Sequence, residues 1–526
     1  MFMLWIAAAV FGLIIIGRPL IVYLQDVKGF RKYPVQNFLS GISPLAYCWE
    51  VGRSHRVFHT RRLHEQLVDN PVVRIGPNWL SFGRARAARD IYGYASPCLK
   101  SRIYDSLQGG GEHLVNITSR ALHSSRRKMV ATAYAPRNIE RWEPKVTETT
   151  TVLLSKLDRQ CTQAPKSSIG PIPGNELTFD GNLWGMLYCF ECVIKIGLSK
   201  DVGFIAQGSD MVEVRRKDGT TVHVNAIDCL HSGSRATSTL IWDTRNFGLW
   251  KRISQNISSR YAKQWDNASQ WRAFIENMTE ERLERFAAGE YLDDLIQLMI
   301  VDRMGTDADI TMQDRVAEVD QMVNGGGDGP GISLVNTLYY LTKNPETLAK
   351  LRAELDEALE SHDGVVPWYK VKNLPYLRAC VDESMRLSPP VATDLLRKTP
   401  PDRSHTIDEV VVPPSTNVSI SAYTAHRDPS VFPDPEAFKP ERWLIKGQGA
   451  LKQMLDAYIP FSAGPRGCIG RSVTILMQLV YIGTLVYRYE FALPSPDWEM
   501  EWIDYFNLWP KELPLKIWKR KKGMIA

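Results

Sequence analysis

The chain has 526 residues, of which 44% are hydrophobic and 23% are charged. These ordinary proportions exclude a disordered chain, a collagen and a polytopic membrane protein, and they supply enough apolar residues for a large core. The net charge of +6 arises from 64 basic and 58 acidic residues. Such a weak bias does not indicate a nucleic-acid-binding protein. The basic segment 516–523 is local and we expect it to be solvated, with a docking patch for a membrane or an acidic partner as the alternative.

The N-terminal segment predicts a membrane anchor. Residues 1–16 are uncharged and almost wholly apolar, and a second apolar stretch follows Arg18 and reaches Leu24. A helix continued to Leu24 would be roughly 34 Å long, enough for a hydrocarbon core of about 30 Å. A cleaved signal peptide is the rival, but it would want a basic start and a small-residue cleavage site. The basic residues follow the apolar run, which places the body of the protein on the cytosolic side.

Apolar periodicity and turn residues predict a helix-rich body. We expect helices over 119–133, 138–160, 180–197, 258–287, 312–343, 345–361 and 374–388. Three pairs of short extended segments are each separated by a turn. They are 72–75 with 79–82, 212–216 with 220–224, and 410–412 with 417–420. The predicted fold class is mainly α with small antiparallel β-sheets. No long linker divides the body, so the expected organisation is an anchor over 1–24, a linker over 25–45 and one domain over 46–526.

The eight cysteines are too sparse for a disulfide scaffold. Cys189 and Cys192 form a CxxC pair inside an apolar run, which favours helix core over a metal site. The compartment is therefore expected to be reducing.

Cys468 differs from the other cysteines because it lies in a glycine-flanked loop, IPFSAGPRGCIG, before a predicted helix over 469–487. A helix N-terminus favours thiolate over thiol, and Gly467 and Gly470 would let a flat cofactor approach closely. A nucleophile, a metal ligand and a buried structural cysteine all remain open from these residues alone.

The loop resembles the cysteine loop of the haem-thiolate monooxygenases, the cytochromes P-450. Phe461, Gly464, Arg466, Cys468 and Gly470 match the family pattern F-x-x-G-x-R-x-C-x-G. The resemblance implies the cytochrome P-450 fold, a haem b (heme, iron protoporphyrin IX) and Cys468 as the axial ligand of its iron.

Two further motifs extend the resemblance over roughly residues 95–515. Glu383 and Arg386 match the family's E-x-x-R helix, and Arg442 belongs to a P-E-R segment between that helix and the cysteine loop. The resemblance implies a structural triad of Glu383, Arg386 and Arg442. The form Pro440-Glu-Arg-Trp is similar to that of the filamentous-fungal secondary-metabolism branch.

The resemblance also implies residues that bind the haem. The family pattern assigns cofactor binding to His123, Arg127, Arg397, Phe461, Arg466 and Cys468. We expect four of these residues to bind the propionates: His123 and Arg127 on the 119–133 helix, Arg397 and Arg466.

On the distal side, the segment NGGGDGPGIS over 324–333 aligns with the family's A/G-G-x-D/E-T-T motif. A loop between two helices is the alternative interpretation, because glycine and proline normally break helices. Asp328 falls on the acid, but Gly329 and Pro330 replace the alcohol residues. We expect Asp328 and Ser333 to be catalytic through proton delivery, with water or a substrate hydroxyl filling the gap.

The resemblance places the substrate pocket between the 105–118 loop, the 320–333 helix face and residues 391–395. The expected lining is Val323, Asn324, Val391, Ala392, Thr393 and Leu395. This mixed lining indicates a small or medium apolar substrate that carries some oxygen functions.

The expected function is a membrane-anchored, haem-dependent monooxygenase of fungal secondary-metabolite biosynthesis in the endoplasmic reticulum membrane, single-pass, with a cytosolic catalytic domain. No nicotinamide motif G-x-G-x-x-G follows a strand, so a separate NADPH–cytochrome reductase is implied. A haem-thiolate isomerase or dehydratase that needs neither oxygen nor reductase is the alternative, because the usual threonine is missing. A non-catalytic haem binder is a third hypothesis.

Overall fold

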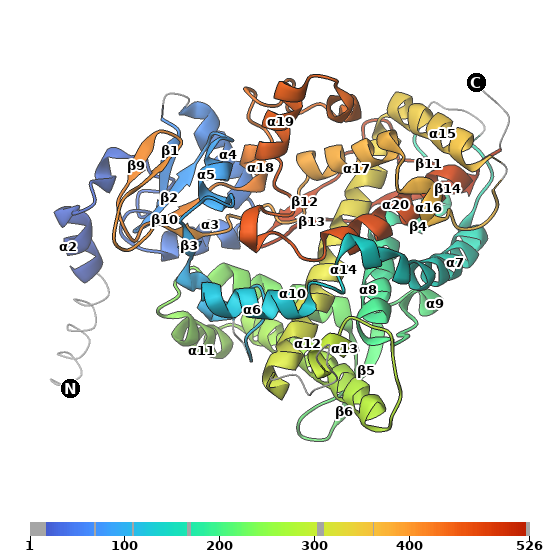
Figure 1. Ribbon diagram of the computed structural model, residues 1–526, viewed down its shortest axis with the longest axis horizontal. Coiled ribbons are helices and arrows are strands. Elements are labelled where there is room, and N and C mark those ends of the chain that lie inside the picture. The colour runs from blue at the N-terminus through green and yellow to red at the C-terminus, as the bar shows by residue number, and fades with distance from the viewer. Residues whose placement is uncertain are drawn as a thin grey trace.

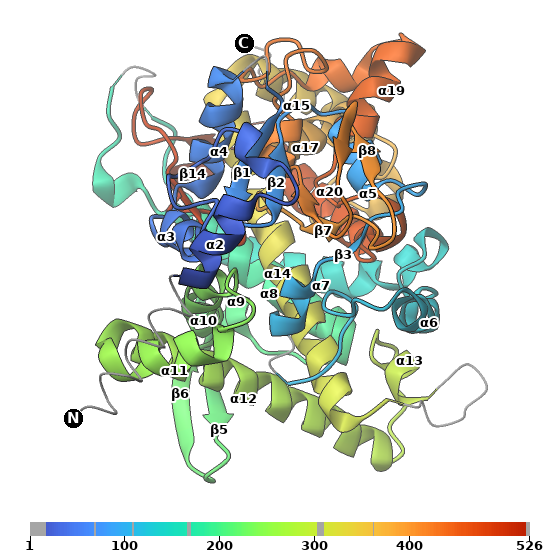
Figure 2. The same cartoon turned by 90° about the vertical axis from the view of Figure 1, so that its left-hand side faces the viewer.

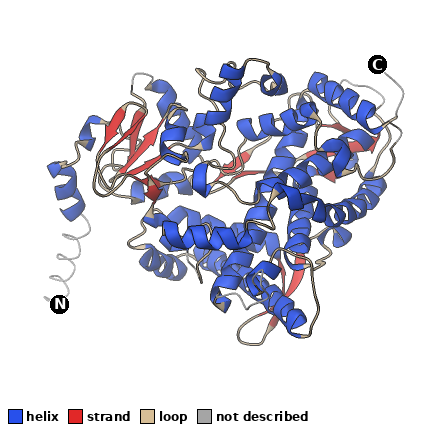
Figure 3. Cartoon of the chain, in the orientation of Figure 1, coloured by secondary structure: helices blue, strands red, loops and turns tan. Residues whose placement is uncertain are grey.

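The structure is a computed structural model, and it describes residues 17–67, 70–107, 110–165, 170–301, 310–360 and 362–521. Helices dominate the molecule, and the strands are short and lie in small groups (Figure 3). The predicted helix-rich body with small sheets is confirmed.

The predicted helices are present within a few residues at each end. They are α6 Arg120–Val130, α7 Glu143–Gln160, α8 Gly181–Leu198, α12 Ser259–Ala287, α14 Met312–Lys343, α15 Pro345–Leu359, α17 Pro375–Leu387 and α20 Arg471–Arg488. Local chemistry sets several of their starts. The Ser119 hydroxyl accepts a hydrogen bond from the N–H of Leu122 and caps α6. Proline occupies the first position of α15 and of α17, where its missing N–H costs nothing.

Two long helices form the centre of the molecule. Helix α14 crosses the body and α8 packs beside it (Figures 1 and 2). The sequence of α8 is apolar on nearly every side, and 15 of its 18 residues are buried, as expected for a core helix. Cys189 and Cys192 are both buried within it, which confirms that they are helix core.

The remaining helices surround this centre. They are α2 Arg18–Gln25, α3 Leu45–Gly52, α4 Arg56–Gln66, α5 Ala87–Tyr92, α9 Phe204–Gln207, α10 Ala226–Leu240, α11 Phe247–Ile257, α13 Gln297–Ile300, α16 Trp368–Val371, α18 Ala422–Ala425 and α19 Gln448–Ala457.

The largest sheet lies at the N-terminal end of the molecule (Figure 1). Its order is β1 (Val72–Gly76), β2 (Trp79–Phe82), β10 (Asn417–Ser419), β7 (Arg397–Lys398), β3 (Leu99–Lys100). The β1–β2 hairpin is confirmed. The expectation that all pairing is antiparallel is wrong, because β10 runs parallel to β2, with Val418 opposite Leu80.

The two extended segments at 410–412 and 417–420 do not pair with each other. Strand β9 (Val410–Val412) pairs with β8 (His405–Ile407), while β10 lies inside the large sheet. There Val418 is fully buried, whereas Val411 of β9 is 64% exposed. Insertion of β10 between β2 and β7 therefore gives it two bonded edges and buries its apolar side chain, which a hairpin with β9 would not do.

The other strands form smaller sheets. They are the hairpin β5 (Met211–Arg215) and β6 (Thr221–Asn225), the hairpin β12 (Trp502–Asp504) and β13 (Leu508–Pro510), and the three strands β4 (Phe179–Asp180), β11 (Tyr489–Ala492) and β14 (Pro514–Lys519). The β5–β6 hairpin is confirmed and projects beside α12 (Figure 2).

The expectation of a solvated basic tail is wrong for residues 516–518, whereas Lys519 is exposed as expected. Residues 516–518 belong to β14, and Lys516 is only 3% exposed and pairs with Glu176. Its neighbours Leu515 and Ile517 are also buried, so the pairing of β14 with strands on both sides outweighs the local charge. Residues 522–526 lie outside the described residues.

Most of the predicted N-terminal anchor also lies outside the described residues, which begin at Gly17. In the described part of the chain, no helix has the length and the apolar character needed to cross a membrane. Residues that follow α2 pack on the large sheet. Phe30 and Tyr33 are buried in the same cluster as Val72, and Val35 forms a bridge with Arg74.

Candidate active site

The cysteine loop has the geometry that its glycines require. Gly464 has a φ of +65°, and a Cβ at this position would lie 2.3 Å from the carbonyl oxygen of Tyr92, so only glycine fits. The loop closes on itself through the N–H of Cys468, which donates to the carbonyl of Phe461 at 2.8 Å. Helix α20 begins three residues later at Arg471. The sequence therefore placed this cysteine correctly at the mouth of a helix.

Cys468 is exposed, whereas the other seven cysteines are buried or partly buried. Surrounding protein raises the pKa of the Cys468 thiol, and the N–H groups of Gly470 and Arg471 and the charge of Arg127 act in the opposite direction. The expectation that the helix N-terminus favours thiolate is therefore opposed by desolvation. A positive group in front of the sulfur would be needed to hold it ionised.

A cavity of about 600 Å³ lies beside this loop. Its lining includes Pro465 and Arg466 of the loop, and Arg127, also on its wall, donates to the carbonyl of Gly467 at 2.8 Å. Four residues expected to bind propionates line this one cavity, from α6, β7 and the loop: His123, Arg127, Arg397 and Arg466. Phe461 lies outside this lining and packs against the main core, with the Arg471 guanidinium over its ring.

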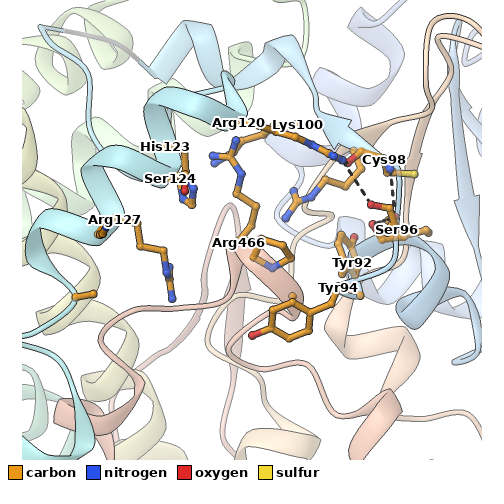
Figure 4. Close-up of a pocket in the computed structure, with 17 residues that line it drawn as sticks. Tyr92, Tyr94, Ser96, Cys98, Lys100, Arg120, His123, Ser124, Arg127 and Arg466 are labelled. Atoms are coloured by element: carbon orange, nitrogen blue, oxygen red, sulfur yellow. Dashed lines mark hydrogen bonds between the residues drawn. The ribbon is translucent and has the colours of Figure 1, made fainter.

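Sequence reasoning missed three further basic residues on the cavity wall: Lys100 and Arg120, which Figure 4 labels, and Lys128. Arg120 lies three residues before His123 on α6, a spacing that predicts a shared helix face. Lys100 gave no such signal, because it reaches the site through pairing of β3 with β7, which sets Lys100 opposite Arg397.

The cavity is strongly electropositive. No acidic residue occurs among its lining residues in the described part of the chain. Burial and then the charges of Arg466 and Lys100 lower the pKa of His123 to about 3. Burial and then the charges of Arg397 and Arg120 lower the pKa of Arg466 to about 10. A dianionic, flat group would relieve this repulsion, so the residues present fit the two carboxylates of a haem.

The predicted triad is assembled as a buried network. The guanidinium of Arg386 forms two bonds of 2.9 Å with Glu383, and Nε of Arg442 donates to Oε1 of the same carboxylate at 2.9 Å. Trp443 adds a third donor to Glu383 through its Nε1 at 3.0 Å. Glu383 and Arg386 are fully buried, and bidentate geometry of this kind is strong and specific.

His426 connects the triad to the cysteine loop, and sequence reasoning missed it. Its Nδ1 lies 3.2 Å from the carbonyl of Arg386, and its Nε2 accepts from the N–H of Ile459 at 2.8 Å. The ring is fully buried, and burial together with the charge of Arg386 lowers its pKa to about 3. Nδ1 is thus the protonated nitrogen of a neutral ring that joins α17 to the first residue of the loop. The signal was the histidine of HRDP, which follows the E-x-x-R helix.

Helix α14 is continuous through its glycine-rich centre, so the alternative of a loop between two helices is wrong. Close packing against α8 explains the glycines. A Cβ at Gly327 would lie 2.6 Å from the ring of Phe190, and one at Gly331 would lie 2.6 Å from the sulfur of Met186. Gly329 is different, because a Cβ there would meet nothing within 4 Å. The family's missing threonine thus corresponds to a position with open space.

Asp328 is held on another side of the helix. The carboxylate is 2% exposed. Its Oδ1 lies 2.7 Å from Nε2 of His231 on α10, and its Oδ2 accepts hydrogen bonds from Trp509, at 2.8 Å, and from Asn507. Sequence reasoning missed all three partners, which lie 97 to 181 positions away in the chain.

The other expected distal residues separate into three places. Ser333 is buried, and its Oγ has no hydrogen-bond partner within the described residues. Val323 lies one turn before Gly326 and Gly327 and is fully buried, which places it in the α8 contact. Its neighbour Asn324 is partly exposed.

Residues after α17 line only a small space. Val391, Thr393 and Leu395 border a cavity of about 10 Å³, which has room for about one water. The Oγ1 of Thr393 is buried without a partner there. Ala392 instead packs into a separate core cluster beside Leu508.

Comparison with known proteins decides the family. The cytochrome P450 family model matches residues 93–510. The chain belongs to the cytochrome P450 family. This cytochrome P450 is 25% identical over 524 residues to the tryprostatin B 6-hydroxylase of Aspergillus fumigatus, covering 97% of this chain and 83% of the relative. It is 27% identical over 464 residues to the cytochrome P450 monooxygenase cicH of Emericella nidulans, covering 86% of each chain.

A solved structure shows the same fold. The crystal structure of the cytochrome P450DA heme domain superposes with a TM-score of 0.72 at 17% identity, over 93% of this chain and 98% of that one. The predicted resemblance to the fungal branch of the family is confirmed, and this cytochrome P450 is a monooxygenase, an oxidoreductase.

Proposed function

We propose that this P450 is a membrane-anchored fungal monooxygenase that inserts one atom of dioxygen into a small or medium apolar substrate, with electrons from a separate NADPH–cytochrome reductase. The observation that carries this proposal is the basic cavity beside the loop that presents Cys468. No acidic side chain is among the described residues that line it. Residues 1–24 would provide the anchor in the endoplasmic reticulum membrane.

The chain's own residues would hold the haem in defined ways. Cys468 would bind the iron, and a haem iron with a thiolate ligand supplies dioxygen activation. His123, Arg127, Arg397 and Arg466 would bind the propionates, joined by Lys100 and Arg120 on the same wall. Bound carboxylates would relieve the repulsion among these cations, so haem binding and cavity stability should depend on each other.

The Glu383 network would fix the loop that carries Cys468. Arg386 reaches the carbonyl groups of His426, Pro435 and Ala437 in addition to Glu383. Since His426 also binds the N–H of Ile459, the network extends from α17 to the loop without a gap. Its role would be to position the ligand rather than to take part in the reaction.

Proton delivery would use Asp328 and Ser333. Both are buried on α14, and the unpartnered hydroxyl of Ser333 lies one turn beyond Gly329. The open space at Gly329 would accommodate a water or a substrate hydroxyl in place of the missing alcohol. Asp328 would supply the proton, and the buried hydroxyl of Ser333 would help to pass it on.

The mixed polar and apolar residues expected for the pocket from the sequence favour a secondary metabolite that carries some oxygen functions. The relative from Aspergillus fumigatus is named as a tryprostatin B 6-hydroxylase, and hydroxylation of an apolar secondary metabolite would likewise suit this chain. Metabolite profiling of a deletion strain would identify the substrate through the compound that accumulates.

Two measurements test the proposal. The ferrous–CO complex should show the red-shifted Soret band of thiolate ligation, and Cys468→Ala should lose it; an unchanged spectrum would exclude Cys468 as the ligand. Product formation from the accumulated compound should require NADPH, reductase and oxygen together. Product formed without oxygen would instead support the isomerase or dehydratase.

A further inference from the structure

The buried carboxylate of Asp328 has three side-chain partners, and they differ in one chemical respect. Asn507 and Trp509 donate to Oδ2 through an amide and an indole N–H, and neither group ionises near neutral pH. His231 contacts Oδ1 through Nε2 at 2.7 Å, and imidazole gains and loses a proton in that range. Only one of the three partners can therefore bring a proton to Asp328.

His231 also differs from the other partners in its access to water. Its side chain is 18% exposed, while that of Asp328 is 2% exposed and Trp509 is 5% exposed. The ring lies against Trp509 with 4.6 Å between centroids, so it is held in place on one face. Within the described residues its Nδ1 has no hydrogen-bond partner in the protein, and the partial exposure leaves that nitrogen open to solvent.

We propose that His231 is the residue that loads Asp328 with protons from solvent, and that it thereby acts on oxygen activation as a positioning residue outside the haem cavity. The inference deepens the proposed function, because it assigns a proton source to Asp328. It uses His231 of α10, a helix for which no motif of the sequence predicted a role.

The transfer balances as a single proton movement. The N–H bond at Nε2 of the imidazolium breaks and an O–H bond forms at Oδ1 of Asp328, with no electron changing hands. Asn507 and Trp509 keep Oδ2 occupied, so the proton arrives at Oδ1. After Asp328 has released its proton, the neutral imidazole regains one from water.

The charges around His231 are consistent with such a role. The carboxylate of Asp328 on α14 lies 2.7 Å from Nε2 of His231. On α10 itself, Asp228 is one turn before His231, and Arg235 is one turn after it and lies 5.9 Å from the ring centre of Trp509. The β12–β13 hairpin contributes Tyr505, Asn507 and Trp509 on the side of His231, and none of the three carries a formal charge.

The first test measures the coupling of the two groups directly. The holoenzyme, labelled with ¹³C-histidine and held as its diamagnetic ferrous–CO complex, would be titrated between about pH 5 and 9 by NMR. The His231 signal is assigned by its loss in His231→Gln. In Asp328→Asn we expect the titration of His231 to differ from that of the wild type, because the carboxylate that faces its Nε2 is gone. Identical titration in both proteins, or none in the wild type, would overturn the proposal.

The second test separates proton supply from hydrogen bonding. Gln at position 231 keeps an N–H donor toward Oδ1 but cannot titrate. With reductase and NADPH, His231→Gln should consume NADPH at least about tenfold more slowly than the wild type and lose its pH dependence. The double variant with Asp328→Asn should be no slower than either single variant, because both residues belong to one route.

Controls make each outcome informative. His223→Gln, on the exposed β6 strand, removes a histidine that is 69% exposed and should leave both rate and pH profile unchanged. The ferrous–CO spectrum confirms that His231→Gln binds haem normally. Wild-type rate and pH profile in His231→Gln would overturn the proposal. A wild-type enzyme that consumes no NADPH with reductase would instead contradict the proposed function, and the NMR titration would still decide the coupling.

Discussion

The proximal and distal sides of this P450 are built on different principles. On the proximal side, the Glu383 network and the cysteine loop match the family motifs residue by residue, and every oxygen of Glu383 has donors. On the distal side, the centre of α14 departs from the family pattern at Gly329 and Pro330, and its acid is bound to residues that no motif marks. The proposed haem-holding side thus repeats the family motifs, whereas the proposed oxygen and substrate side departs from them and takes partners for its acid from α10 and the β12–β13 hairpin.

The proximal network should show the largest effect of any substitution. Glu383→Ala leaves Arg386 and Arg442 buried without their carboxylate, which should cost about 3–5 kcal/mol of unfolding free energy and give little haem-loaded protein. Arg403→Ala is a control, because its pair with Asp402 is 65% exposed on both sides and is worth at most about 1 kcal/mol. Chemical denaturation and haem content would measure both, and normal yield with normal turnover in Glu383→Ala would contradict the structural role.

The distal glycines should divide into two classes. Gly327→Ala places a Cβ 2.6 Å from the Phe190 ring, and such overpacking typically costs about 1–3 kcal/mol. Gly329→Ala meets open space and should be neutral or stabilise the helix by up to about 1 kcal/mol. Thermal unfolding of the two variants, made in parallel, would measure the difference. Equal destabilisation by both would show that Gly329 is not open.

His426 should make the proximal side sensitive to acid. Burial lowers its pKa to about 3 from 6.5, so the unfolded state binds a proton first as the pH falls. The stability is fully present above pH 6.5 and declines below it, by about 1.4 kcal/mol at pH 5.5. His426→Gln can still accept from Ile459 but cannot titrate, so its unfolding free energy should fall less between pH 7.5 and pH 5.5. If the unfolding free energy of the wild type and of the variant fell equally with pH, His426 would be excluded as a source of the acid sensitivity.

The N-terminal segment lies outside both regions and should show the smallest effect. No residue of α2 is buried, and the contact of Tyr23 with Arg74 is a single cation–π interaction. Deletion of residues 2–24 should change the unfolding free energy by less than about 1 kcal/mol and keep the haem, while it releases the protein from membranes. Fractionation after an alkaline wash would measure this, and a truncated protein that stayed with membranes would contradict a single anchor. A further variant in the 516–521 segment would control for peripheral contact.

The sequence by itself determined the features that depend on near neighbours. Three local signals act within a few residues: the spacing of apolar residues along each helix, the cap at Ser119, and the prolines at the start of α15 and α17. Those helices therefore lie where they were predicted. The cysteine loop followed for the same reason, since Gly464 and Cys468 lie four positions apart in one segment. The triad was predictable because its motifs combine helical spacing with a family pattern, although Trp443 and His426 were not foreseen.

Only the tertiary structure decided which distant residues meet. Strand β10 pairs with β2 across more than 300 positions, because burial of Val418 requires two neighbours rather than a hairpin. The glycines of α14 allowed the interpretation that the helix is interrupted there. The helix is continuous, and α8 packs so closely against Gly327 and Gly331 that no side chain fits at these positions. Asp328 was identified from its motif, but its partners on α10 and on the β12–β13 hairpin could not be, because a buried carboxylate takes whichever donors the fold brings within reach.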